Sequence, residues 1–155
     1  MFSRKTTAGD ICTRIVSIAP PGLSLEEAAR VMRDQHVGCL VIVEEPSPED
    51  RQVVGVLTDR DIVTQVVAGQ KNPNGLCAAD VMSREVASVR EDDSLLDVLA
   101  TMRRKAVRRV PVVGPHDRLI GVISIDDVLE VLAEEMQAVA DAIGAAQHHE
   151  QRQGR

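Results

Sequence analysis

An internal duplication constrains the fold of this chain more than any other feature of its sequence. Residues 10–14 and residues 80–84 agree in residue class at every position and lie 70 positions apart. Two further pairs of segments correspond at the same spacing: 24–28 with 94–98, and 37–43 with 107–113. The spacing then falls to 66, because residues 55–63 align with 121–129. The change falls in a turn, where insertions cost little, so one supersecondary unit is predicted to occur twice.

Both copies have the same predicted order of elements. In the first copy, a short extended piece at 15–18 leads to a helix that begins after Ser24, within a capping box. An apolar strand follows, then a second strand at 53–57 and a helix from Thr58. The corresponding landmarks of the second copy are 86–89, Ser94, 119–123 and Ser124. Continuously apolar strands indicate a sheet covered on both faces. The predicted fold class is α/β (α+β), with two pseudo-symmetric β-α-β-β-α repeats packed sheet to sheet.

Turn-forming residues at 69–75 and a polar C-terminus divide the chain further. The predicted segments are an N-terminal segment (1–9), a first repeat (10–69), a linker (70–77), a second repeat (78–133), a helical extension (134–146) and a disordered tail (147–155). The last helix carries more apolar residues, among them Leu132, Val139 and Ile143, than a terminal helix on a small domain needs. A homodimer is therefore expected.

Composition excludes several classes of function. Hydrophobic residues make up 44% of the chain and charged residues 27%, which predicts a packed core. A net charge of -6 and a single aromatic residue, Phe2, argue against nucleic-acid binding. No apolar run approaches the ~20 residues of a membrane span, and residues 1–10 lack the apolar core of a signal peptide. We therefore expect a cytoplasmic protein with neither nucleic acid nor membrane as partner.

No pattern of catalytic or metal-binding residues is present either. The three cysteines form no Cys-x-x-Cys pair, and the four histidines are scattered or lie near the C-terminus. No Ser-His-Asp or Cys-His set and no glycine-rich phosphate loop occurs. We expect a protein that is not an enzyme and holds no metal or cofactor.

The duplicated pattern resembles a tandem pair of CBS domains, also called a Bateman module. The resemblance rests on the lead-in at 80–83, the strand at 109–113 and the closing Gly-Val-x-Thr/Ser-x-x-Asp-Ile/Val segments, and it covers about residues 10–132. Such modules sense small ligands and usually regulate an attached enzyme, channel or transporter. None is attached here, so the resemblance implies a stand-alone module with an unknown protein partner. It also supports the homodimer, since CBS pairs associate through their helices.

Two interpretations apply to the pairs Thr58/Asp61 and Ser124/Asp127. Each pair fits a capping box at a helix start. Each also lies where a strand ends and a helix begins, a place that favours anions, and a carboxylate there can accept hydrogen bonds from a ribose diol. The residues alone leave both interpretations open. In CBS pairs these positions have the nucleotide role.

The resemblance further implies how the residues divide between two pockets. The better-equipped pocket would contain Thr58, Asp61, Arg60, Arg108, Arg109, Ile15, Ser17 and Val37. The weaker pocket would contain Ser124, Asp127, Ala87 and Val107, with Gly38 and Cys39 in place of the two arginines. The alternative for Arg108 and Arg109 is a solvated basic stretch after a helix. The favoured function is a regulatory module that senses adenine nucleotides, AMP before ADP, ATP or another adenosyl ligand. The alternative is a structural or stress-response protein with vestigial pockets that binds a protein partner.

Overall fold

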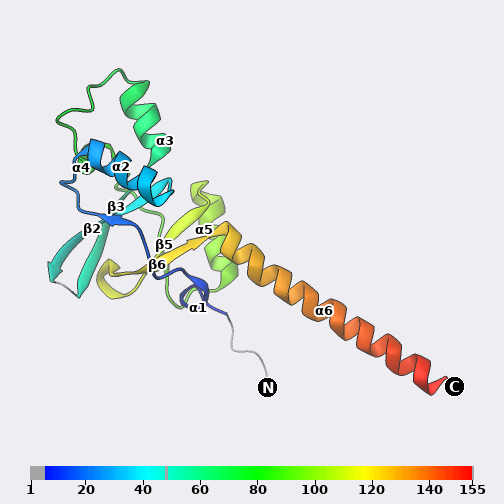
Figure 1. The fold of residues 1–155 in the computed structure, drawn as a ribbon. Coiled ribbons are helices and arrows are strands. Elements are labelled where there is room, and N and C mark those ends of the chain that lie inside the picture. The colour runs from blue at the N-terminus through cyan, green and yellow to red at the C-terminus, as the bar shows by residue number, and fades with distance from the viewer. Residues whose placement is uncertain (1–5, 48, 155) are drawn as a thin grey trace.

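The chain forms two three-stranded sheets of the same topology (Figure 1). The computed structural model describes residues 6–47 and 49–154. The first sheet contains β1 (Ile18–Ala19), β2 (Cys39–Ser47) and β3 (Asp50–Thr58), and the second contains β4 (Val89–Arg90), β5 (Arg109–Val113) and β6 (Leu119–Ser124). In each sheet the first pair of strands is parallel and the second pair antiparallel. The predicted fold class, with two pseudo-symmetric repeats, is confirmed.

The register relates the two copies residue by residue. Ala19 pairs with Ile42, and Val89 pairs with Val112. Ala19 and Val89 are 70 positions apart in the sequence, and so are Ile42 and Val112. Ala87 is therefore the counterpart of Ser17. The first strands were expected at 15–18 and 86–89 but begin only at Ile18 and Val89. The residues before them are drawn away, because Thr13 pairs with Val122 of the other sheet and Ser83 pairs with Val56.

Two matching helices cover the sheets. Both α2 (Leu25–Gln35) and α5 (Leu95–Lys105) begin where predicted, because the hydroxyl oxygens of Ser24 and Ser94 accept hydrogen bonds from the amides three residues on. Each helix ends at a residue in the left-handed region, His36 or Ala106, both with φ 54°. The inner faces of these helices supply Leu25, Ala28, Met32, Val98 and Met102 to two aliphatic cores.

The helices that close the copies differ. In the first copy the short α3 (Asp59–Asp61) runs into a π-helix, η1 (Ile62–Val67). In the second copy, after the short η2 turn (Pro115–Asp117), β6 leads directly into the long α6 (Ile125–Gln153). No described helix is long and apolar enough to cross a membrane.

The lead-in segments are exchanged between the copies. Ala8, in α1 (Ala8–Ile11), is buried in the core of the second copy, and its amide donates to Asp93 O at 2.9 Å. Ala78, in α4 (Ala78–Val81), is buried in the core of the first copy, and its amide donates to Leu23 O at 2.8 Å. The predicted repeats 10–69 and 78–133 are therefore units of sequence, whereas each packing unit borrows the lead-in of the other copy. The sheets also contact each other directly through β3 and β6, and Gln52 of β3 forms a bridge with Arg118, the residue before β6.

The expected disordered tail at 147–155 is wrong as far as Gln153. This segment continues α6, which ends at the capping residue Gly154; residue 155 lies outside the described part. The reason is local: residues 145–153 contain neither proline nor glycine, and Ala, Gln, Glu and Arg favour helix even where no core covers them.

Candidate functional site

The two closing motifs meet in one central cleft between the copies. Thr58 ends β3 and pairs with Cys39, while Ser124 ends β6 and pairs with Arg109. The cleft encloses about 520 Å³. Its lining residues are Gly38, Cys39, Val56, Thr58, Asp59, Arg60, Val107, Arg108, Arg109, Ser124, Ile125 and Asp126. A hollow of this volume is the right size for a small organic ligand.

Three arginines line this cleft without a partner of opposite charge. Within residues 6–47 and 49–154, no ion pair involves Arg60, Arg108 or Arg109. Asp59 and Asp126 also line the cleft, so it is rich in charge of both signs. Guanidinium groups that are free to pair are the usual partners of phosphate oxygens.

Both predicted capping boxes form. Asp61 Oδ2 accepts from the Thr58 amide at 2.9 Å and from Thr58 Oγ1 at 2.8 Å. Asp127 Oδ2 accepts from the Ser124 amide at 2.7 Å, and the Asp127 amide donates to Ser124 Oγ at 3.2 Å. In the described part of the chain, Oδ1 of each carboxylate makes no hydrogen bond. The capping role therefore leaves one acceptor oxygen per motif available to a ligand.

A narrower slot of about 250 Å³ shares Cys39, Arg109 and Ser124 with the cleft. Its other lining residues are Thr13, Ile15, Val16, Ser17, Val37, Val41, Val122 and Asp127. One side is thus apolar and the other carries a carboxylate, a hydroxyl and a guanidinium. Ile15 is 94% exposed at this slot, and the Ser17 hydroxyl donates to Gln35 Oε1 at 2.6 Å.

The residues that line the slot belong to both of the pockets predicted from the sequence. Ile15, Ser17 and Val37 were grouped with Thr58 and Asp61, neither of which lines the slot. The exchanged lead-ins are the cause: the segment after Thr13 runs beside β6 and so reaches the motif of the second copy.

The weaker predicted set is divided in the same way. Ala87 follows Ser83, which pairs with Val56, two residues before Thr58, so its segment belongs beside the motif of the first copy. Val107 lines the central cleft instead of a separate second pocket. The pairing of each lead-in with the opposite motif had no signal in the sequence, because it depends on where the connections cross.

Cys39 and Arg109 occupy equivalent places in the two copies and line both hollows. Burial raises the pKa of the Cys39 thiol to about 11, although the nearby Arg109 guanidinium acts in the opposite direction. The thiol is thus protonated at neutral pH and serves as a small apolar wall. Among the described residues, no group of three or more His, Cys, Asp or Glu side chains could hold a metal ion.

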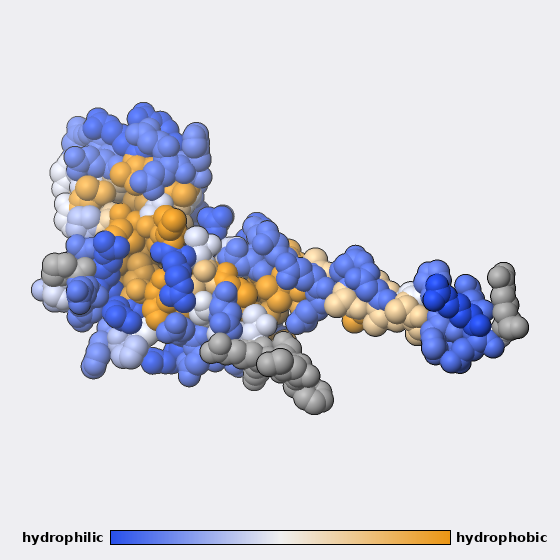
Figure 2. All heavy atoms as spheres, turned by 60° about the horizontal axis from the view of Figure 1, so that its bottom comes forward, coloured by the Kyte–Doolittle hydropathy of each residue, from blue (hydrophilic) through white to orange (hydrophobic). Residues whose placement is uncertain are grey.

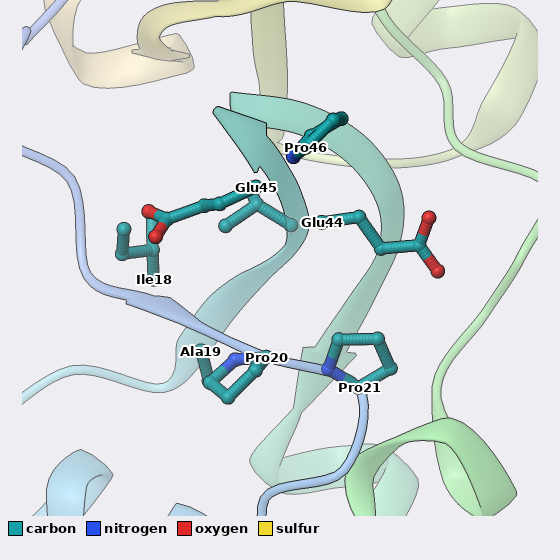
Figure 3. A pocket seen from close by; sticks show the side chains of 8 residues that line it. Ile18, Ala19, Pro20, Pro21, Glu44, Glu45 and Pro46 are labelled. Carbon is teal, nitrogen blue, oxygen red and sulfur yellow. The ribbon is translucent and has the colours of Figure 1, made fainter. Parts of the chain in front are cut away.

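A third hollow of about 510 Å³ lies at the end of the first sheet (Figure 3). Figure 3 shows Pro20 and Pro21 on one side of it and Glu44, Glu45 and Pro46 on the other. Its charged lining groups are carboxylates, and one of them, on Glu45, already accepts a hydrogen bond from Arg51 at 2.8 Å. This hollow is therefore poorly suited to a phosphorylated ligand.

Two copies of one β-α-β-β-α unit, with hollows of small-ligand size between them, form a tandem module. The family profile described as "CBS domain" matches residues 8–68 and 78–134. The chain belongs to the CBS-domain family and contains two CBS domains in tandem.

Two curated relatives are similar over most of this chain. Hypoxic response protein 1 of Mycobacterium tuberculosis is 34% identical over 129 residues, which cover 83% of this chain and 87% of that protein. The uncharacterized protein MK0525 of Methanopyrus kandleri is 34% identical over 128 residues. The match covers 83% of this chain but only 63% of the length of MK0525.

Solved structures show the same fold. The crystal structure of Hypoxic Response Protein I with two coordinated zinc ions has a TM-score of 0.72 at 33% identity, covering 81% of this chain and 98% of that one. The CBS domain pair of protein MJ0100 has a TM-score of 0.69 at 25% identity, covering 82% and 99% of the two chains. That pair was crystallised in complex with 5-methylthioadenosine and S-adenosyl-L-methionine.

Proposed function

We propose that this CBS pair is a regulatory module that senses adenine nucleotides and is not an enzyme. AMP is the favoured ligand, ahead of ADP, ATP or another adenosyl compound. The observation that carries the proposal is the continuity of the apolar slot with an arginine-lined cleft. The complex of MJ0100 with two adenosyl compounds supports this ligand class. The expected compartment is the cytoplasm.

The slot and the cleft suit different parts of one nucleotide. The adenine ring would lie among Ile15, Val16 and Val37, since pockets for such rings are mostly apolar. The ribose diol would donate to Asp127 Oδ1, which the capping box leaves available. The phosphate would bind Arg109, which lines both hollows.

This arrangement favours the motif of the second copy as the main site. The sequence pointed to Thr58 and Asp61 because the cations cluster with them. Arg109 is shared with the slot, however, and the apolar residues Ile15 and Val37 accompany Asp127. Thr58, Arg60 and Arg108 line the remainder of the cleft, and Asp61 is hydrogen-bonded to Thr58. This part of the cleft is then the place for a longer phosphate chain or a second, weaker ligand.

Calorimetric titration with AMP tests the proposal with a matched pair of variants. Asp127→Asn and Asp61→Asn each keep the shape of the capping side chain and remove its charge. A hydrogen bond to a charged group contributes ~1.5–3 kcal/mol, so Asp127→Asn should weaken AMP at least about tenfold. Asp61→Asn should change the affinity less than about threefold. Greater sensitivity at Asp61 would restore the assignment made from sequence.

The phosphate contact is tested in the same titrations. Arg109→Ala should weaken AMP more than adenosine, because only AMP loses a charge-assisted hydrogen bond. Equal losses for both ligands would contradict the placement of the phosphate. If wild-type protein shows neither heat of binding nor a rise in melting temperature with any adenine nucleotide, the function is the alternative, a protein-binding module with vestigial pockets.

A further inference from the structure

Most of α6 extends beyond the body of the molecule (Figure 1). The helix has 29 residues, which gives a rod of about 43 Å at 1.5 Å per residue. Its first turns contact β6, and Ile125 packs against the core of the second copy. Within the described chain, Val128 is the only residue of α6 that is fully buried.

The extended part carries one continuous apolar stripe. Its large members are Leu129, Leu132, Met136, Val139 and Ile143, with exposed fractions between 41% and 71%. Their spacing alternates between three and four residues and continues to Ala146. This is the a/d pattern of a heptad repeat, which keeps all six side chains on one face. Figure 2 shows apolar side chains along the helix up to a hydrophilic C-terminal end.

We propose that a second copy of this chain packs against this stripe, so that two α6 helices form an antiparallel coiled coil. A heptad stripe is complementary to itself, because each a or d side chain fills a hole between four residues of the facing helix. The flanking positions include Ala133, Ala140 and Ala142, whose small side chains let two helices approach closely. The pairing removes the exposed apolar face from water without any other partner.

The polar side of α6 argues against a lipid surface as the occupant. Glu130, Glu134 and Asp141 lie on the side opposite the stripe. Helices that lie in membrane interfaces are rich in Lys and Arg there, because they meet anionic lipids. An acidic face would be repelled by the same surface.

Charge also sets the orientation. The first eleven residues of α6 contain five acidic residues and no basic one: Asp126, Asp127, Glu130, Glu134 and Glu135. The later part contains Asp141 and Glu150 together with Arg152. Parallel pairing would align the two acidic segments 125–135 with each other, whereas antiparallel pairing places each opposite residues 140–150, which contain two acidic residues instead of five. The opposed helix dipoles favour the same orientation. We align the two stripes about their centre, so that Met136 faces Val139 of the second copy and Leu129 faces its Ala146.

Light scattering on the full-length chain without nucleotide tests the pairing. Wild-type protein at micromolar concentration should have twice the chain mass of 16.8 kDa. The double variant Met136→Glu/Val139→Glu should raise the dimer dissociation constant at least tenfold. The control Ala138→Glu/Ala145→Glu adds the same charge to the outer face of the helix and should keep the wild-type mass. A monomeric wild-type protein overturns the proposal. So does a Met136→Glu/Val139→Glu variant that remains as dimeric as the control.

A photo-cross-link tests the orientation. Benzoylphenylalanine placed at position 129 should cross-link to the segment 143–149 of the second copy, and mass spectrometry identifies the linked peptides. Cross-links to the region around position 129 itself would show parallel helices and overturn the antiparallel arrangement. Both tests are independent of ligand binding, so failure of one proposal is distinguishable from failure of the other.

Discussion

At the scale of single residues, positions 39 and 109 show how the two copies of a duplicated fold come to differ in the side chains that line the hollows. The two positions begin equivalent strands and pair with the equivalent residues Thr58 and Ser124. One carries a thiol and the other a guanidinium. Since both side chains line the slot and the cleft, the second copy supplies a guanidinium to these hollows at the position where the first copy supplies a thiol.

The partly buried thiol of Cys39 should make stability depend on pH in the alkaline range. Burial raises the pKa of Cys39 from 9.0 to about 11, so the folded state keeps a proton that the unfolded state loses. This contribution to the free energy of unfolding is complete below pH 9 and is lost as the pH rises towards 11. The chain has no tyrosine to titrate in that range. Urea unfolding at pH 8 and pH 10.5 should show a smaller fall in stability for Cys39→Ala than for wild type; equal falls would contradict the assignment.

At the scale of elements, local signals at helix starts succeed wherever the sequence contains a complete capping box. Ser24, Thr58, Ser94 and Ser124 all cap helices at the predicted residues. These boxes need only the side chains and backbone amides of two residues three positions apart, so the sequence is sufficient. The C-terminal end of α6 differs from the prediction of a disordered tail, because polar residues continue a helix where, as at 145–153, no helix breaker occurs.

Two alanine substitutions in and before α5 distinguish the loss of a helix cap from the mere loss of a hydroxyl group. Ser94 accepts a hydrogen bond from the Asp97 amide at 3.3 Å and donates to its carboxylate at 2.6 Å. Ser94→Ala should lower the free energy of unfolding by ~1 kcal/mol. Thr101→Ala removes a hydroxyl from the middle of the same helix and should be neutral or slightly stabilising, since Ala has the higher helix propensity. Equal destabilisation by both, measured by urea unfolding, would remove the capping explanation.

At the scale of the whole molecule, the exchanged lead-ins join the two copies, because each lead-in packs in the core of the opposite copy. Each core contains a buried alanine from the lead-in of the opposite copy. Ala8 lies in the core of the second copy, and Ala78 lies in the core of the first. Each lead-in also passes close to a glycine of the opposite sheet. A Cβ at Gly121 would lie 2.6 Å from the carbonyl oxygen of Thr13, which is backbone and cannot rotate away.

Two alanine substitutions test this close crossing. Gly121→Ala should destabilise the protein by about 1–3 kcal/mol, because the lead-in must move to admit the methyl group. At Gly22 nothing lies within 4 Å of an added Cβ and φ is not left-handed, so Gly22→Ala should change stability by less than ~0.5 kcal/mol. Thermal unfolding of both variants checks this. A harmless Gly121→Ala would mean that the lead-in does not pass there.

The sequence alone was sufficient for the duplicated β-α-β-β-α order, the helix caps, the aliphatic cores and the CBS family, because these depend on periodicity and on contacts a few residues apart. It also identified Thr58, Asp61, Ser124, Asp127 and the cleft arginines as the groups of interest. It could not show which apolar segment accompanies which motif. That choice depends on Thr13 reaching Val122 and Ser83 reaching Val56, contacts between residues far apart in the chain. Only the tertiary structure decided it, since a sequence repeat carries no record of the sheet beside which its first residues lie.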